Sequence, residues 1–407
     1  MMLLQILMTI GIAQALALAV LLLIKKQKNQ SDYLLSIELV LLFLITVLYV
    51  FRMELAQVLP GFAINAILLT SLAVPLFYLF ARTAAGETLN FLSPKIYAHF
   101  APFIAAYVLF TINFHTLPYV DKCLVDQMIH YGGSLDCPLW FWFIYYGTFV
   151  VQFPFYLWRT YRVLKKHEHY LLASFSYTED INLQWLLRFL WGLTFMWFLI
   201  IGFEIIAGNF LGIVADEFGF YPAMITMVLL VLYLGVAGLR HRVIFLEEEE
   251  KVVARPVFNS LAIGTEVEDD RKYSNSSLTE DQASDYLRRL QRYMSEAKPH
   301  LEPRITIGEL ANRLQIPVND LSQIINEQLD QNFYDFINSY RVDAFKALLQ
   351  NPDSNQYTLL SLGLEAGFNS KSTFNAIVKK YTGLTPSQYA RQQRSLLNNS
   401  IPSSPSL

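Results

Sequence analysis

The chain has 407 residues, of which 54% are hydrophobic and 16% charged, and its formal net charge at pH 7 is −3. This composition excludes an ordinary soluble protein along the whole length, because so many apolar residues would leave large apolar patches exposed. The average conceals two halves: long apolar runs extend to about Leu239, and a charged sequence with helical periodicity begins at Arg240. The net charge describes neither half, so it argues neither for nor against a polyanionic partner.

The apolar half contains seven runs long enough to cross a membrane, since a helical span needs about 20 mostly apolar residues. The second run is the least clean, because Glu38 lies inside it and Arg52 and Glu54 stand at its end. The predicted spans are Met2–Ile24, Leu34–Phe51, Phe62–Ala81, Ile96–Leu117, Leu139–Trp158, Leu187–Leu211 and Tyr221–Leu239.

Several polar side chains fall inside these runs. In lipid they are expected to face the interior of a helical bundle, where neighbouring helices satisfy them or where they line a pocket for a small-molecule or lipid signal. They are Glu38, Asn65, His99, Asn113, Glu204 and Asn209.

Lysine and arginine residues fall mainly in one alternate set of loops. Short loops rich in these residues stay in the cytoplasm, whereas the opposite set contains Lys122 and, at a helix end, Arg52. The pattern predicts a multi-pass membrane protein with its N-terminus outside and its C-terminal half in the cytoplasm. The first set consists of Lys25, Lys26, Lys28, Arg82, Lys95, Arg159, Arg162, Lys165, Lys166, Arg240 and Arg242.

The first span could instead be a cleaved signal peptide, with "ALA" at residues 16 to 18 as the cleavage site. However, it lacks a basic N-terminal region, and its apolar run continues past that point to "KKQK". Cleavage would also leave six spans and place the C-terminal half outside the cell. We therefore favour an uncleaved span.

The two cysteines, Cys123 and Cys137, fall in the same expected external loop. Disulfides persist in external compartments, so we predict a Cys123–Cys137 bridge. Two alternatives stay open: the cysteines are unrelated small residues, or they are a thiol pair that awaits a metal with His115 and His130 nearby.

An acidic connector without sustained periodicity is expected over residues 243–278. A helix is predicted next, over residues 279–300, because Thr279 is a suitable N-cap with Gln282 three residues on. Its apolar face either packs within its own chain or pairs with a second copy in a homodimer. That face consists of Leu287, Leu290 and Met294.

The stretch "ITIGELANRLQIPVNDLSQIINEQL" (305–329) has the pattern of a helix-turn-helix motif, in which two apolar helical faces are separated by a turn around Gln315. Pro317 suits the first turn of the second helix. The apolar faces are Ile307, Leu310, Ala311 and Leu314, then Leu321, Ile324 and Ile325. The side chains expected to be exposed on the second helix are Asn319, Ser322, Gln323 and Asn326.

A second motif follows in "TLLSLGLEAGF" and "NSKSTFNAIVKKYTG" (358–383), after a long amphipathic helix in "NFYDFINSYRVDAFKALLQ". Gly367 suits a left-handed turn and Ser370 suits an N-cap. Two recognition helices joined by one rigid spacer can enter successive major grooves, about 34 Å apart. In the second of them Lys371, Ser372 and Asn375 are expected to be exposed, with Phe374, Ile377 and Val378 inside.

These motifs resemble the AraC/XylS family of bacterial transcription regulators over residues 304–394, above all in "FINSYRVDAFKALL" and "EAGFNSKSTFNAIVKKYTGLTPSQY". The resemblance implies binding to double-stranded DNA and contact with RNA polymerase. By position it implies base reading by Asn319, Ser322 and Gln323 in the first recognition helix and by Lys371, Ser372 and Asn375 in the second. Lys379 and Lys380, farther along, are expected to contact phosphates.

The sequence departs from the family pattern in three places. Gln315 replaces the usual turn glycine, Gly363 stands where a small alanine is common, and Ala376 occupies a position that is often basic. We expect these departures to affect local stability and contact strength more than the fold.

The combined expectation is an all-α protein: a seven-helix transmembrane bundle, a linker and a cytoplasmic double helix-turn-helix domain. The predicted regions are a sensor domain over 1–242, the connector over 243–278, a helix over 279–300, the DNA-binding domain over 301–394 and a disordered tail over 395–407. The resemblance extends to membrane-bound family members, and it implies a bacterial cytoplasmic-membrane regulator in which the bundle controls DNA binding.

Two other functions compete with this one. A seven-span receptor or transporter whose cytoplasmic domain binds a protein partner leaves the duplicated helix-turn-helix unexplained. An enzyme is not predicted, because the sequence contains no phosphate-binding glycine loop, metal-spaced His/Cys cluster or nucleophile elbow. The run His167, Glu168 and His169 is interpreted as a solvated loop. We accordingly expect no catalytic residue, metal or cofactor.

Overall fold

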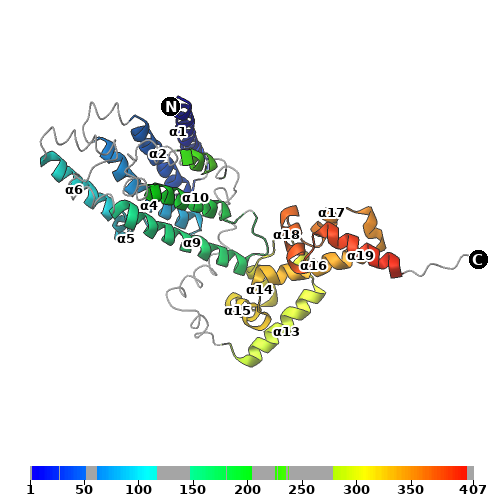
Figure 1. Ribbon diagram of the computed structural model, residues 1–407. Helices are drawn as coiled ribbons and strands as arrows, with labels where there is room; N and C mark the ends of the chain where they lie inside the picture. Colours follow the sequence, from blue (N-terminus) through cyan, green and yellow to red (C-terminus); the bar gives the residue numbers. More distant parts are fainter. Residues whose placement is uncertain are drawn as a thin grey trace, which may run out of the picture. The chain divides into compact units, whose positions relative to one another are not determined.

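The structure is a computed structural model of the 407-residue chain. It describes residues 2–26, 28–51, 62–116, 147–179, 181–203, 225–226, 228–234, 237 and 278–400. Within these residues every named element is helical (Figure 1), which confirms the all-α class. The chain divides into two compact units: Met1–His167 with Leu183–Phe245, and Glu168–Asn182 with Leu246–Leu407.

The first unit is built from long apolar helices, and α2 packs against both α1 and α4. A buried ion pair fixes the turn between α1 and α2: Lys25 Nζ lies 3.0 Å from Asp32 Oδ2, and the Asp32 side chain is 1% exposed. The helices are α1 (Met2–Ile24), α2 (Gln30–Val50), α4 (Phe62–Ala84), α5 (Pro94–Tyr97), α6 (Ala101–Thr116), the π-helical turn η2 (Gly147–Gln152), α9 (Phe153–Ser174) and α10 (Gln184–Phe203).

Two of the polar residues expected to face the interior of this unit do so. Glu38 is 4% exposed, and His99 Nδ1 lies 2.9 Å from the hydroxyl of Tyr156. The side chains of the other four expected polar residues, and both cysteines, lie outside the described residues, so the disulfide stays a prediction.

Two helical stretches among the described residues are long and apolar enough to cross a membrane, Gln30–Leu48 and Pro94–Ile112. Shorter apolar stretches are Ala13–Ile24 and Leu68–Ala84. These four overlap the first four predicted spans. The seven-span bundle as a whole is not confirmed and stays a prediction.

The second unit contains two hydrophobic clusters that share the helix α16 (Phe333–Gln350). Figure 1 shows α16 running between α14 and α15 on one side and α17 to α19 on the other. Phe333 and Phe336 belong to the first cluster, and Phe345 belongs to the second. The predicted spacer therefore forms part of both motif cores. The other helices are α13 (Glu280–Glu296), α14 (Ile307–Leu314), α15 (Val318–Leu329), α17 (Leu359–Glu365), α18 (Lys371–Thr382) and α19 (Pro386–Ser400).

The start of α13 agrees with the sequence prediction. Thr279 Oγ1 accepts a hydrogen bond from the Gln282 backbone amide at 3.3 Å, and the Thr279 amide donates back to Gln282 Oε1 at 3.1 Å. The helix ends at Glu296, earlier than the predicted 300. Leu290 and Met294 are fully buried in the same cluster as α14 and α15, so this apolar face packs within its own chain.

Candidate DNA-binding site

The first helix-turn-helix motif consists of α14 and α15. Its predicted apolar positions are all buried, as expected. Thr306 caps α14 by accepting a hydrogen bond from the Glu309 amide at 3.2 Å. The helix ends at Leu314, and the next residue, Gln315, has the left-handed angles φ 53° and ψ 42°. Gln315 thus has the left-handed conformation that glycine adopts most easily.

The polar side chains of α15 bond to one another. Gln323 is only 9% exposed, and its Nε2 donates to Glu327 Oε2 at 2.9 Å. Asn326 Nδ2 donates to Ser322 Oγ at 3.4 Å, while Asn319 is exposed. The expectation that Gln323 is exposed was wrong, because Gln323 lies at the edge of the apolar stripe, next to buried Ile324. Its base-reading role stays a prediction.

The second motif turns at Gly367, as predicted. Gly367 has φ +93°, and a Cβ added there would lie 2.3 Å from the backbone oxygen of His300. Gly363, in the preceding helix α17, has a different constraint: a Cβ there would lie 2.8 Å from the ring of buried Phe374. The second departure from the family pattern therefore follows from close packing between α17 and α18.

The recognition helix α18 begins as predicted. The N-cap Ser370 accepts a hydrogen bond from the Thr373 amide at 3.1 Å. Lys371, Ser372 and Asn375 are exposed, whereas the predicted inward residues Phe374, Ile377 and Val378 are buried. The first turn of α18 is therefore organised as a base-reading surface requires, and the contacts themselves stay predictions.

The two lysines assigned to phosphates differ. Lys380 Nζ lies 2.6 Å from Asp335 Oδ1 on α16, and the hydroxyl of neighbouring Tyr381 donates to the Asp335 backbone oxygen at 3.0 Å. Lys380 thus has a structural partner that a phosphate would have to replace. Lys379 is exposed on the same helix, so it is the better candidate for a phosphate contact.

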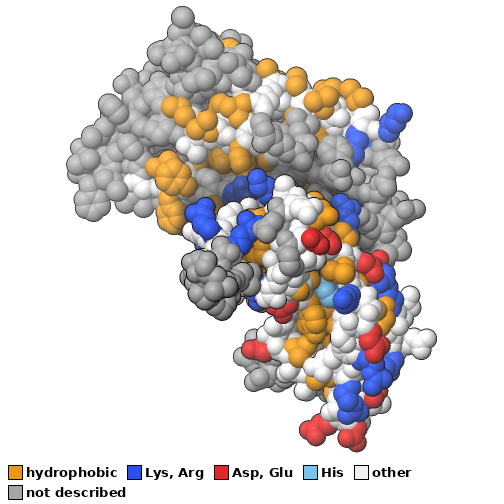
Figure 2. Space-filling view, turned by 90° about the vertical axis from the view of Figure 1, so that its right-hand side faces the viewer, with side chains coloured by type: hydrophobic (Ala, Val, Ile, Leu, Met, Phe, Trp, Pro, Cys, Tyr) orange, Lys and Arg blue, Asp and Glu red, His pale blue; other side chains and the backbone are white. Residues whose placement is uncertain are grey.

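Charge is distributed unevenly between the motifs. Residues 301–350 contain four Lys or Arg and seven Asp or Glu, whereas residues 351–394 contain five and two. Figure 2 shows Lys and Arg interspersed with Asp and Glu on the second unit. Because phosphate contacts dominate DNA affinity, we expect the second motif to attract DNA more strongly than the first.

The sequence did not predict that residues 168–182, which connect the fifth and sixth expected spans, belong to the second unit. Phe175, Tyr177 and Ile181 of this segment lie in the same hydrophobic cluster as α14 and α15. Phe175 forms an isolated antiparallel bridge with Thr306. The apolar side chains in this connection between two expected spans were the signal that could have revealed the packing.

Arg341 of α16 anchors the same segment. Its side chain is 1% exposed, and its donors reach the Ser176 backbone oxygen at 2.9 Å, the His300 oxygen at 2.9 Å and the Glu302 oxygen at 2.8 Å. Burial lowers the pKa of Arg341 to about 10. The guanidinium therefore stays charged at neutral pH and joins two backbone segments, one at Ser176 and one at residues 300–302.

Glu179, in the same segment, reaches the second motif. Its Oε1 accepts hydrogen bonds from Ser370 Oγ at 2.8 Å and from Thr373 Oγ1. A carboxylate thus lies at the N-terminus of the recognition helix α18. No sequence pattern indicated this contact.

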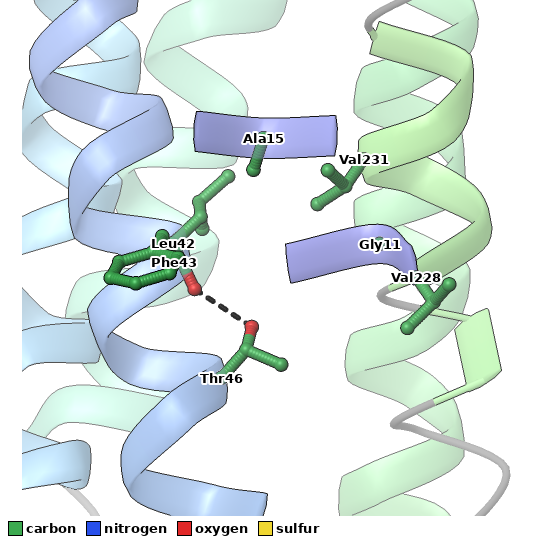
Figure 3. Close-up of a pocket in the computed structure, with 7 residues that line it drawn as sticks. All are labelled: Gly11, Ala15, Leu42, Phe43, Thr46, Val228 and Val231. Carbon is green, nitrogen blue, oxygen red and sulfur yellow. Dashed lines mark hydrogen bonds between the residues drawn. The ribbon is translucent and has the colours of Figure 1, made fainter. Parts of the chain in front are cut away.

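The first unit has a small apolar pocket, which Figure 3 shows between α1, α2 and residues 228–231. Its single hydroxyl side chain, Thr46, already donates to the Leu42 backbone oxygen at 2.7 Å. The lining therefore offers apolar contact and no unsatisfied hydroxyl. The pocket is lined by Gly11, Ala15, Leu42, Phe43, Thr46, Val228 and Val231. Among the described residues, no group of three or more His, Cys, Asp or Glu could hold a metal ion.

Comparison with known proteins agrees with the geometry of the two motifs. Residues 310–392 match a family model described as a helix-turn-helix domain. The melibiose operon regulatory protein of Escherichia coli (strain K12) is 30% identical over 92 residues, which are 22% of this chain and 30% of that protein. The HTH-type transcriptional regulator CdhR of Pseudomonas aeruginosa is 31% identical over 101 residues, 25% of this chain and 29% of that protein.

The uncharacterized HTH-type transcriptional regulator YtdP of Bacillus subtilis (strain 168) is 28% identical over 95 residues, 23% of this chain and 12% of that protein. The chain thus spans less than a third of the length of these relatives. No solved structure matches the chain significantly. Residues 310–392 form an AraC-type helix-turn-helix domain, and the relatives matched are transcription regulators.

Proposed function

We propose that this chain is a membrane-embedded one-component transcription regulator, in which the first unit lies in the bacterial cytoplasmic membrane and controls specific binding of the second unit to double-stranded DNA. The domain match over residues 310–392 is the observation on which the DNA-binding part depends. The regulatory signal in this proposal is a small molecule or a lipid, and RNA polymerase and a second copy of the chain are further partners.

Exposed apolar side chains support the membrane part of the proposal. The stretch Pro94–Ile112 is only 11% buried although its mean hydropathy is 1.4. A core helix of a soluble protein would bury such side chains, whereas lipid accommodates them. On α6 they include Ile104, Tyr107, Val108 and Ile112, each about half exposed or more. Figure 2 shows further apolar side chains on the described surface of the first unit.

DNA binding is tested with the full-length protein in lipid nanodiscs and a randomised duplex library. We expect enrichment of a defined sequence, and loss of that enrichment in the Lys371→Glu/Lys379→Glu variant, which reverses two exposed charges on α18. A library that remains random after several rounds of selection would refute the DNA-binding part.

Membrane topology is tested separately with reporter fusions. Fusions after Lys28, Lys166 and Leu407 should be cytoplasmic, and one near Gly132 should be external, because Lys and Arg fall in the first set of loops. A cytoplasmic fusion at Gly132 would exclude the seven-span arrangement. Mass spectrometry of non-reduced peptides from membranes isolated with an alkylating agent tests the Cys123–Cys137 bridge.

A further inference from the structure

The 168–182 segment joins both halves of the second unit. Its apolar side chains pack with the first motif, and its backbone is bound at Ser176 by Arg341 and by Asn338, whose Nδ2 lies 3.3 Å from the Ser176 oxygen. Its acidic residue, Glu179, bonds to the N-terminus of the second recognition helix. The segment thus contacts both motifs of the DNA-binding domain within the same chain.

The Glu179 carboxylate lies where a DNA phosphate is expected to bind. The N-terminus of a helix attracts anions through its free amide groups and its dipole. In helix-turn-helix proteins the first residues of a recognition helix approach the DNA, and helix N-termini and hydroxyl side chains bond to phosphate oxygens. The Ser370 hydroxyl donates its hydrogen bond to Glu179, which also places a negative charge beside Lys371 and Ser372.

Chain connectivity attaches this contact to the first unit. The chain enters the 168–182 segment through α9, which begins in the first unit and ends at Ser174, and leaves it into α10, which begins at Gln184. Both ends of the segment are therefore held by helices of the first unit. A displacement of α9 or α10 would therefore be transmitted along the chain to the backbone at Ser176 and Glu179.

We propose that the 168–182 segment is an autoinhibitory clasp: Glu179 occupies the anion-binding N-terminus of α18 in competition with a DNA phosphate, and the first unit regulates DNA binding by seating or withdrawing it. This proposal rests on the proposed DNA-binding function. It identifies a residue in the expected membrane half, outside both motifs, as a determinant of DNA affinity.

The first test measures DNA affinity of full-length Glu179→Gln in nanodiscs at two salt concentrations. Glutamine keeps hydrogen-bonding capacity toward Ser370 and Thr373 but removes the charge, so DNA should bind about three- to tenfold more tightly. Asp353→Asn is the matched control, because it removes one exposed negative charge from η7 (Pro352–Gln356) in the same unit. The control should change affinity by less than about twofold.

A second variant weakens the contact from the other side without changing any charge. Thr373→Val removes one donor to Glu179 and leaves the Thr373 backbone amide to be capped by Ser370. It should also tighten DNA binding, by about twofold, because a single hydrogen bond to a carboxylate is lost. In the wild type, DNA should accelerate amide hydrogen exchange at Ser176, whose N–H donates to the Ile305 oxygen at 3.3 Å.

The outcomes separate the two proposals. If wild type binds DNA and Glu179→Gln binds equally or more weakly, the clasp is wrong and Glu179 is a structural cap. Unchanged or slower exchange at Ser176 in the DNA complex would also overturn it. If neither the wild type nor any variant binds DNA, the proposed function itself fails.

Discussion

The two helix-turn-helix motifs form their turns and recognition helices with different residues. The first turns at Gln315 without glycine and bonds the polar side chains of its recognition helix to one another. The second turns at Gly367, caps its recognition helix with Ser370 and has an excess of basic residues. We therefore predict that the second motif supplies most of the phosphate attraction and that the first contributes shape and specificity.

The turns also differ in what surrounds them. Gly367 lies against the backbone of His300, whereas Gln315 is exposed. One turn is therefore held by close packing and tolerates only glycine. The turn at Gln315 is instead destabilised by the left-handed conformation of a residue with a Cβ, and a substitution by glycine can remove this strain. Each prediction below tests one side of this contrast.

The largest effect is expected at Gly367. Gly367→Ala should lower the free energy of unfolding of the second unit by about 2–4 kcal/mol, because the new Cβ would clash with the His300 oxygen at a strained φ. Gly383→Ala is the matched control, since Gly383 has φ +74° and no heavy atom within 4 Å of the added Cβ. It should lose only about 1 kcal/mol from backbone strain. Native-state hydrogen exchange of α16 amides measures both, and equal losses would show that the approach of His300 is unimportant.

The division between specificity and affinity is tested at Gln323 and Lys379. Gln323→Ala should relax preference at one or two base pairs, because a bidentate amide contact discriminates by about 1–3 kcal/mol. Reading a base requires Gln323 to exchange its bond to Glu327 for the base edge. Lys379→Ala should weaken binding to all sequences alike and reduce the salt slope by about one unit at most.

Selection from a randomised duplex library at two salt concentrations separates these results. Unchanged preference in Gln323→Ala would remove that residue from the base-reading set. Altered preference in Lys379→Ala would mean that the two roles are reversed.

The buried ring of His300, whose backbone oxygen lies against the second turn at Gly367, is expected to make the stability of the second unit depend on pH. Its ring is 6% exposed and lies 5.5 Å from the Tyr340 ring, and burial, followed by Arg341 and Lys298, lowers its pKa to about 4. The folded pKa lies below the unfolded value of about 6.5. The associated stability is therefore complete above pH 6.5 and is lost as pH falls toward 4.

Between pH 7 and 5 we expect this group to reduce the free energy of unfolding by about 1–2 kcal/mol. His300→Phe keeps a ring against Tyr340 but takes up no proton, so the loss should shrink by that amount in hydrogen exchange of α16 corrected for intrinsic rates. A variant that loses as much stability as the wild type would assign the pH dependence to other groups.

Local patterns in the sequence predicted the second unit well. Thr279 and Ser370 mark helix starts because a hydroxyl that accepts an amide hydrogen bond is a local feature. Hydropathy located the helices of the first unit less closely. It ended the fifth span at Trp158, yet α9 continues to Ser174, because hydropathy reports where an apolar run ends and not where a helix ends.

Long-range contacts account for what the sequence did not predict. Ser370 and Glu179 are 191 residues apart, and Ser176 and Arg341 are 165 apart. No periodicity or capping rule connects positions so distant. The burial of Gln323 was missed for a related reason: a residue at the edge of an apolar stripe is covered or exposed according to its neighbours in space.

The smallest effect is expected at the first turn. Gln315 ends α14 in the left-handed region, and the Ile316 amide donates to the Ala311 oxygen at 3.0 Å. This is the pattern of a helix end that usually contains glycine. For a residue with a Cβ, this conformation destabilises the folded state by about 1–2 kcal/mol relative to glycine. Replacement by glycine removes this strain, but part of the gain is offset because glycine loses more conformational entropy on folding.

Gln315→Gly should therefore stabilise the second unit by about 0.5–1 kcal/mol, the opposite sign to Gly367→Ala. Gln315→Ala is the control, because it removes the same exposed side chain and keeps the Cβ, and its effect should lie near zero. Hydrogen exchange of α14 and α16 amides measures both variants. A gain with alanine as large as with glycine would place the penalty in the glutamine side chain, and the two turns would then differ in packing alone.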